Sequence, residues 1–109
     1  MNKPLTLGIL GGMGPMSGAY FYELIIARTK AETDQEHIDV VLSGRASTPD
    51  RTGFISGKIS ESPIEVMRAD ARRLEAFGAE LIAIPCNTAH YFYEEVARAV
   101  KVPALNIIY

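Results

Sequence analysis

The sequence predicts an α/β domain of three layers, a parallel four-stranded sheet with helices on both faces. Short apolar runs alternate along the chain with longer segments of helical periodicity, in the order β-α-β-α-β-α-β. Strands that alternate with helices pair in parallel, and the connecting helices cover both faces of the sheet. With 109 residues, the chain has about the size of one such domain.

The first strand is expected over residues 5–10, an apolar run that ends in the glycine-rich turn 11–15. Residues 17–33 form the first predicted helix, because apolar side chains recur there every three or four positions. Ser17 is a suitable N-cap for this helix. Residues 38–42 are apolar and β-branched, which predicts the second strand.

A long polar loop is expected over residues 43–60. Ser62 and Glu65 then match a capping box around Pro63, which predicts the start of a second helix. Gly78 is placed to end that helix. The apolar stripe of the helix consists of Ile64, Met67, Ala71, Leu74 and Phe77.

The third strand is predicted over residues 81–84, where an apolar run is broken by Pro85. A third helix over 88–100 and a fourth strand over 102–108 complete the pattern. Ligands bind beyond the carboxyl ends of the strands in such sheets. The segments expected at that edge are the turn 11–15, the loop around Arg51 and residues 86–88.

The composition excludes several classes of protein. The formal net charge is −2 with both signs interleaved, so the chain lacks the basic stripe of a nucleic-acid binder. No apolar run approaches the ~20 residues of a membrane span, and the start lacks the apolar region of a signal peptide. A single cysteine allows no internal disulfide and no multi-cysteine metal cage. A cytoplasmic protein without nucleic-acid or membrane partners is therefore expected.

Cys86 is the first candidate for chemistry, because it stands where a buried strand gives way to the start of a helix. Free N–H groups and the helix dipole favour a thiolate there, which can act as a general base or a nucleophile. The structural alternative is a small buried hydrophobe without chemistry. Asn87 and Thr88 supply hydrogen-bond donors for a carboxylate or phosphate, although either residue also caps helices for purely structural reasons.

Three further side chains are weaker candidates. His90 follows Cys86 by one helical turn, which suits a Cys–His pair, but a surface histidine or a group that tunes the thiol explains it better. Arg51 suits bidentate binding of a carboxylate, whereas an ion pair with Asp50 or a surface acid is the alternative that the residues alone favour. His37, just before a strand, is expected in solvent.

The glycines between Gly8 and Gly18 allow a dinucleotide-binding interpretation. A GxxxGxG spacing follows a strand, and Arg45 is placed to meet a 2′-phosphate. Against this interpretation, Gly8 lies inside the strand, and Pro15 stiffens the turn where a helix should begin. Glycines at these positions equally allow any small ligand to approach the backbone, or only a tight turn.

Three motifs, in this order, resemble those of the aspartate/glutamate racemases. The family's first-strand loop is similar to residues 11–15 (GGMGP), and the substrate loop of its aspartate-racemase branch is similar to residues 47–52 (STPDRT). The segment that holds its first catalytic cysteine resembles residues 84–90 (IPCNTAH). The resemblance spans essentially the whole chain.

The resemblance implies a two-domain fold with the active site in the cleft, in which residues 1–109 are the N-terminal domain and the second domain is absent. It implies racemisation without pyridoxal phosphate, metal or nucleotide: one thiolate removes the α-proton, and an opposing thiol reprotonates the other face. Cys86 would be one of these thiols. Asn87 and Thr88 would hold the α-carboxylate, Arg51 the side-chain carboxylate of aspartate or glutamate, and Met13 would line the pocket.

With one cysteine and one domain, the 109-residue chain is expected to be inactive alone. Missing partners are expected to leave apolar surface near the fourth strand, and a homodimer would fit the family. Two other functions stay open, a module that binds a small carboxylate without chemistry and an NADP-binding oxidoreductase domain built on the glycine-rich turn. Carboxylate-dependent stabilisation without α-proton exchange would favour the binding module.

Overall fold

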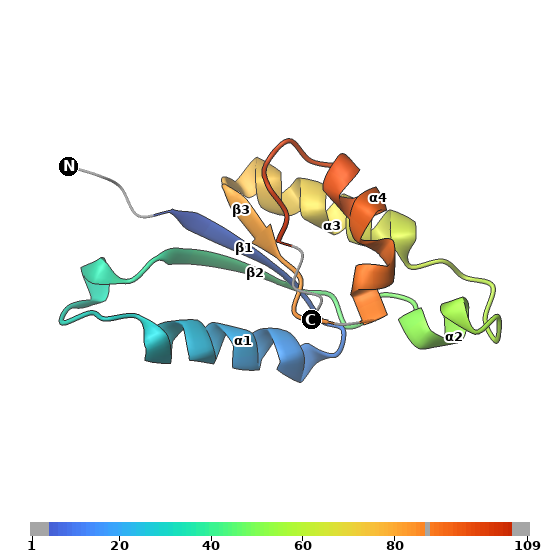
Figure 1. The fold of residues 1–109 in the computed structure, drawn as a ribbon, viewed down its shortest axis with the longest axis horizontal. Helices are drawn as coiled ribbons and strands as arrows, with labels where there is room; N and C mark the ends of the chain where they lie inside the picture. The colour runs from blue at the N-terminus through green and yellow to red at the C-terminus, as the bar shows by residue number, and fades with distance from the viewer. Residues whose placement is uncertain (1–4, 87, 106–109) are drawn as a thin grey trace.

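A three-stranded parallel sheet lies at the centre of the computed structural model, which describes residues 5–86 and 88–105 (Figure 1). The strands are β1 (Thr6–Gly11), β2 (Asp39–Gly44) and β3 (Leu81–Ala83). Their order in the sheet is β2-β1-β3, and β1 pairs in parallel with both neighbours. The predicted parallel pairing is confirmed, and each strand boundary lies within one or two residues of its predicted position.

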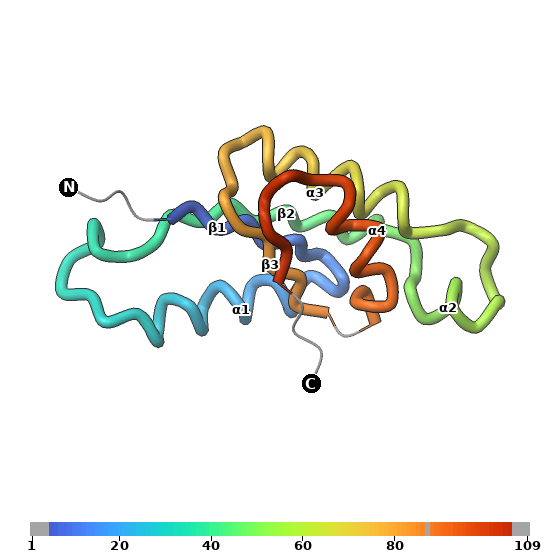
Figure 2. Tube along the Cα trace, turned by 45° about the horizontal axis from the view of Figure 1, so that its top comes forward, coloured from blue at the N-terminus to red at the C-terminus, as the bar shows by residue number. Residues whose placement is uncertain are grey.

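Helices cover both faces of this sheet, as the sequence predicts. Helix α1 (Pro15–Arg28) lies on one face, and α3 (Ile64–Phe77) and α4 (Tyr93–Arg98) lie together on the other (Figure 1, Figure 2). A 3₁₀ turn, η1 (Asp34–Glu36), leads into β2, and another, η2 (Thr88–Phe92), precedes α4. Among the described residues, no helix combines the length and the apolar character needed to cross a bilayer. The three-layer α/β class is confirmed.

The predicted fourth strand, 102–108, is reduced to a single bridge in the described part of the chain. Ala104 pairs in parallel with Ile82 of β3. The N–H of Ile82 donates to the Pro103 carbonyl at 2.9 Å, and the N–H of Leu105 donates to the Ile82 carbonyl at 2.8 Å. Pro103 has no N–H and cannot donate to a ladder, which limits pairing before Ala104. Four predicted strands are thus corrected to three, and the end of the predicted segment lies outside the described residues.

Helix α1 begins earlier than predicted, because Pro15 occupies its first turn instead of blocking it. The N-cap is Gly14 and not Ser17. Proline suits the first helical position, since its φ is already helical and its missing N–H would have no partner there. The helix ends at Arg28 rather than near residue 33.

Helix α3 begins with a simpler cap than the predicted capping box. Pro63 is at the N-cap, and the hydroxyl of Ser62 accepts a hydrogen bond from the N–H of Ile64 at 3.1 Å. Glu65, which a capping box would direct back to the helix start, pairs instead with Arg68 at 3.0 Å. The helix start is therefore where the sequence predicts it, with a different hydrogen-bond pattern.

The main core lies between the sheet, α3 and α4. Met67, Ala71 and Leu74 of α3 are buried in it, as the apolar stripe predicts. Phe77 is 72% exposed instead, because Gly78 ends the helix with a φ of +125° and returns the chain towards the sheet. The stripe therefore stops one turn earlier than its periodicity suggests.

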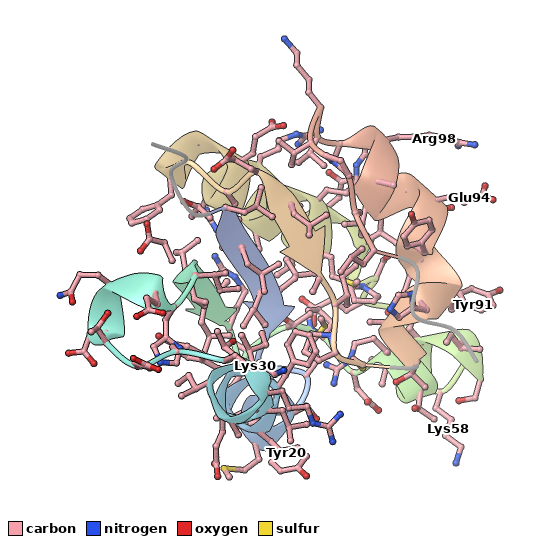
Figure 3. The ribbon with its side chains drawn as sticks, turned by 60° about the vertical axis from the view of Figure 1, so that its left-hand side comes forward. Tyr20, Lys30, Lys58, Tyr91, Glu94 and Arg98 are labelled. Carbon is pink, nitrogen blue, oxygen red and sulfur yellow. The ribbon has the colours of Figure 1, made fainter. Side chains whose placement is uncertain are left out.

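The face of the sheet under α1 has a much smaller core, formed by Leu7, Ile9 and Ala83. Gly18 is the buried residue of α1, and Tyr20, 58% exposed, projects away from the sheet (Figure 3). Other exposed apolar side chains of α1 are Met16 and Ile26. In the predicted fourth strand, Leu105 is 39% exposed, and the rest of that segment lies outside the described residues.

Candidate functional site

The glycine-rich turn after β1 lies directly against the loop after β2. Gly12 has a φ of +87°, and a Cβ on this residue would lie 2.5 Å from the backbone of Arg45. Gly11 is also closely surrounded, since its Cβ would lie 3.0 Å from the Leu42 side chain. Glycine is therefore required at position 12 for the two loops to contact through their backbones.

Arg45 connects the loop after β2 to α3 through a buried carboxylate. Its Nε donates to both carboxylate oxygens of Asp70, at 2.9 and 2.8 Å, and Arg73 donates to the same group at 2.9 Å. The hydrogen bond to Asp70 and the negative charge of Asp70 raise the pKa of Arg45, against a smaller opposing effect of desolvation. The hydroxyl of Thr48 donates to the Arg45 carbonyl at 2.8 Å, which fixes the loop further along.

These contacts account for the features that suggested a dinucleotide site. The guanidinium of Arg45 binds Asp70, which would compete with a 2′-phosphate for it. Gly8 lies within β1, where a Cβ would be 2.9 Å from the Cβ of Ala79. The close packing of β1 against the segment that holds Ala79 therefore requires a glycine at position 8. The glycine pattern is thus explained by contacts within the protein.

A short helix, α2 (Arg51–Ile55), interrupts the loop that the sequence predicts over residues 43–60. Asp50 caps this helix, since its carboxylate accepts a hydrogen bond from the N–H of Gly53 at 3.0 Å. A capping aspartate after a proline was the available sequence signal. The helix is too short to show a period, so hydrophobic patterning missed it.

Arg51 begins α2, and its guanidinium bends back towards its own loop. Nη1 donates to the carbonyls of Thr48 and Pro49 at 3.3 and 3.2 Å. Nε is buried without a hydrogen-bond partner in the part of the chain that the structure describes. The alternative ion pair with Asp50 is not formed among these residues, because Asp50 caps the helix. The guanidinium therefore keeps donors for a ligand.

Cys86 follows β3 and is half-buried. Its Sγ lies 3.4 Å from the hydroxyl oxygen of Thr88, which is exposed, and its N–H donates to the Ile84 carbonyl at 2.9 Å. The side chain packs at the border of the main core, so the sulfur is not sealed among apolar groups. Asn87, predicted beside it, lies outside the described residues.

The segments expected at the carboxyl edge of the sheet do lie together. The ring of Phe54 in α2 is 5.9 Å from the ring of Phe92 in η2, between centroids, so the arginine loop lies beside the cysteine segment. Met13 of the glycine-rich turn is 4% exposed and belongs to the same core cluster as Phe92. Cys86 packs against this cluster as well. Little of the Met13 side chain therefore reaches the surface, where the resemblance would have it line the pocket.

His90 is buried, 4% exposed, which corrects the expectation of a surface histidine. Its Nε2 lies 2.9 Å from the Ile84 carbonyl, and within the described ranges it makes no hydrogen bond to Cys86. The error arises because η2 is a 3₁₀ turn, with about 3.0 residues per turn instead of about 3.6. Helical spacing therefore assigns position 90 to the wrong face, and the favourable dipole of a long helix after Cys86 is replaced by a short turn.

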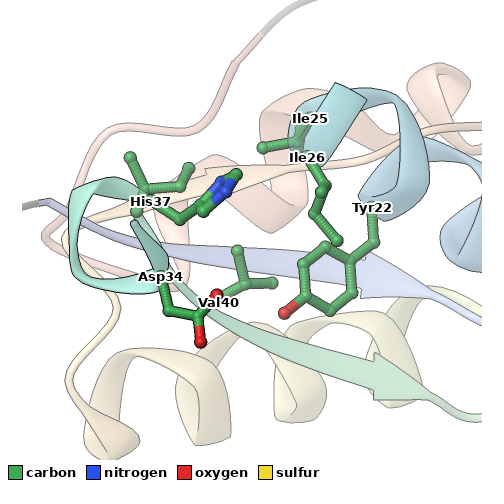
Figure 4. Close-up of a pocket in the computed structure, with 7 residues that line it drawn as sticks. Tyr22, Ile25, Ile26, Asp34, His37 and Val40 are labelled. Atoms are coloured by element: carbon green, nitrogen blue, oxygen red, sulfur yellow. The ribbon is translucent and has the colours of Figure 1, made fainter. Parts of the chain in front are cut away.

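A hollow of about 320 Å³ lies between α1 and β2 (Figure 4). Its lining includes Tyr22 of α1, Asp34 of η1 and His37. His37 is half-buried there, and not exposed to solvent as predicted. The hollow involves the amino-terminal part of β2, so it is separate from the edge that carries the thiol.

A half-buried thiol, a neighbouring hydroxyl and an arginine loop thus share the carboxyl edge of an open parallel sheet. Ligands bind at this edge in open parallel sheets, so it is the candidate site for a small ligand in this α/β domain. The chain belongs to the Asp/Glu/hydantoin racemase family, whose sequence model matches residues 10–109. The family that the three motifs resemble is thus confirmed.

Several amino-acid racemases and their homologues are similar to this chain. The broad specificity amino-acid racemase RacX of Bacillus subtilis (strain 168) is 35% identical over 108 residues, which cover 94% of this chain and 45% of RacX. The aspartate racemase of Picrophilus torridus has a TM-score of 0.84 at 35% identity, over 94% of this chain and 43% of that one. An aspartate racemase homologue from Pyrococcus horikoshii OT3 has a TM-score of 0.74 at 28% identity, over 97% of this chain and 45% of that one. The chain therefore spans less than half the length of these relatives.

Proposed function

We propose that the full-length protein is an amino-acid racemase in which Cys86 serves one face of the substrate. The observation that carries the proposal is the half-buried sulfur at the sheet edge where the glycine-rich turn and the arginine loop lie together. Membership of the racemase family supports the same activity. Two of the relatives, an aspartate racemase and a broad specificity amino-acid racemase, agree with this activity.

The proposed chemistry needs a base on one face of the substrate Cα and an acid on the opposite face. The thiolate of Cys86 takes the α-proton, an S–H bond forms, and the C–H electron pair is delocalised into the α-carboxylate. A second thiol, which the resemblance assigns to the other domain, gives its proton to the opposite face of Cα. Because an α-hydrogen is a very weak acid, donors at the carboxylate must stabilise the developing charge. No cofactor is proposed.

Thr88 is proposed to help hold the α-carboxylate. Its hydroxyl is exposed and lies 3.4 Å from the Cys86 sulfur, so a carboxylate bound there would place the adjacent Cα next to the thiol. Short distances of this kind are what proton transfer requires. Asn87 is proposed to share the role, on the basis of the resemblance alone.

Arg51 is proposed to select acidic amino acids such as aspartate and glutamate. Its guanidinium has no carboxylate partner among the described residues, and its two hydrogen bonds to carbonyls, at 3.3 and 3.2 Å, are long. Shorter charge-assisted bonds to a substrate carboxylate would replace them favourably. Met13 is proposed to support the pocket from beneath, given its burial in the core.

The proposal is tested by following the racemisation of L-aspartate by chiral chromatography, with the full-length protein and its Cys86→Ala variant. We expect the variant to lose activity by on the order of 10²- to 10⁴-fold, the usual contribution of a positioned base. Thermal unfolding of both proteins controls for folding. A variant that racemises at the parent rate would refute the role of the thiol. A parent protein that aspartate stabilises without racemisation would instead be a binding module.

A further inference from the structure

The imidazole of His90 is one turn away from Cys86 and lies inside the protein. It is 4% exposed, and its Nε2 lies 2.9 Å from the carbonyl oxygen of Ile84. A carbonyl can only accept a hydrogen bond, so Nε2 carries the proton and donates. Nδ1 is buried and has no hydrogen-bond partner in the part of the chain that the structure describes.

The acceptor of this bond also sets the conformation of the cysteine segment. The Ile84 carbonyl receives a second hydrogen bond, from the N–H of Cys86, at 2.9 Å. A carbonyl oxygen has lone pairs for both donors. Pro85, between the two residues, restricts the backbone further because its φ is fixed. His90 therefore holds the same oxygen that orients the Cys86 backbone.

The ring of His90 is itself held in place. It stacks on Tyr93 with a centroid distance of 5.8 Å and an interplanar angle of 11°. The hydroxyl of Tyr93 donates to the Ala104 carbonyl at 2.7 Å, and Ala104 pairs with Ile82 in β3. The imidazole is thus fixed between the end of β3 and the start of α4.

We propose that His90 is a positioning residue for the thiol: through the Ile84 carbonyl, its Nε2–H holds Cys86 at the angle that proton transfer needs. This inference rests on the proposed function. A buried ring with one unpartnered nitrogen is unfavourable, and an aromatic hydrocarbon ring would fill the same space without that penalty. The hydrogen bond from Nε2 is the feature that only a histidine-like side chain supplies.

Two amide substitutions separate the two nitrogens in the full-length protein. The amide nitrogen of glutamine reaches about as far as Nε2, and that of asparagine about as far as Nδ1. We expect His90→Gln to keep kcat near the parent value, while His90→Asn and His90→Phe lose on the order of 10- to 100-fold in kcat, because small displacements of a reacting group have effects of this size. KM for aspartate should stay nearly unchanged.

A second measurement does not depend on racemisation. The rate at which iodoacetamide alkylates Cys86, read at its own peptide by mass spectrometry, reports how the segment holds the sulfur. We expect faster alkylation in the Asn and Phe variants than in the parent, and a parent-like rate in His90→Gln. This comparison remains informative if Cys86→Ala still racemises and the proposed function fails.

The inference is overturned if His90→Asn keeps kcat while His90→Gln loses it, because Nδ1 would then be the group that acts. It is also overturned if all three variants keep both kcat and the alkylation rate of the parent. Should the Asn and Phe variants fail to fold, His90→Gln alone decides. A folded glutamine variant as inactive as Cys86→Ala contradicts the role of the Nε2 hydrogen bond.

Discussion

Arg51 is the residue whose proposed role in substrate recognition can best be separated from folding. In Arg51→Gln we expect KM for aspartate to rise roughly 10- to 100-fold, since hydrogen bonds to charged groups contribute about 1.5–3 kcal/mol. Initial-rate kinetics measure this change. Arg98→Gln is the matched control, because Arg98 lies on the outer side of α4 and pairs with Glu94 at 3.4 Å (Figure 3). Equal KM values in both variants would remove Arg51 from the substrate site.

Gly12 allows the contact between the glycine-rich turn and the Arg45 backbone to be tested by a single substitution. Gly12→Ala combines a φ of +87° with a Cβ placed 2.5 Å from the Arg45 backbone, so we expect a large loss of stability. Backbone strain alone contributes about 1–3 kcal/mol in such positions. Gly14→Ala is the control, because a Cβ there meets none of the described atoms within 4 Å. Urea unfolding measures both, and similar unfolding free energies would contradict the observed contact.

Single residues differ in how far the sequence reveals them. The position of Cys86 was predictable, because Pro85 interrupts the apolar run of the third strand. The residue that follows must then lie near the carboxyl edge of the sheet, where ligands bind. The position of His90 was not predictable, because its burial follows from a 3₁₀ turn that sequence periodicity does not distinguish from an α-helix. The ion pair between Arg45 and Asp70 was also missed, since residues 25 positions apart meet only in the folded chain.

At the scale of elements, the carboxylate of Asp70 joins α3 to the loop that continues into α2. Asp70→Ala leaves the guanidinium of Arg45 without its partner, so we expect a lower thermal midpoint and a higher KM for aspartate as the arginine loop loosens. Arg73→Ala is the milder control, because Arg73 is largely exposed. Differential scanning calorimetry and kinetics measure the two effects. A parent-like midpoint in Asp70→Ala would show that this connection carries no stability.

The pH dependence of this connection follows from the raised pKa of Arg45. Stabilisation by a cation with a raised pKa is complete below the ordinary pKa of the group, and it is lost only as the pH rises through the raised, folded-state pKa. Titration of Arg45 should therefore leave the difference in thermal midpoint between the parent and Asp70→Ala unchanged from neutral to mildly alkaline pH.

The elements themselves show where patterning succeeds. Alternation of β1, α1, β2, α3 and β3 was predictable, because each element is long enough or apolar enough to reveal its period. The start of α2 depends on the carboxylate of Asp50, which caps it. The pairing of Ala104 with β3 depends on the position of Pro103 beside that strand. Local contacts of this kind decide short elements, and no periodic signal reports them.

At the scale of the whole molecule, the chain corresponds to less than half of its relatives. The proposed reaction needs groups on both faces of the substrate, and this chain holds one cysteine. We therefore expect the isolated 109-residue chain to show no racemisation of aspartate by chiral chromatography, while the full-length protein does. Circular dichroism controls for folding of the isolated chain. Racemisation by the folded segment alone would exclude the two-domain mechanism.

In the proposed mechanism, the sulfur of Cys86 moves the α-proton on one face of the substrate only. The most direct measurement follows loss of the α-proton from L- and D-aspartate separately, by NMR in D₂O, with the full-length protein and its Cys86→Ala variant. We expect exchange of one enantiomer to fall by on the order of 10²-fold or more, while the other still exchanges at the opposing thiol. Parent-like exchange of both enantiomers by a folded Cys86→Ala protein would contradict the claim.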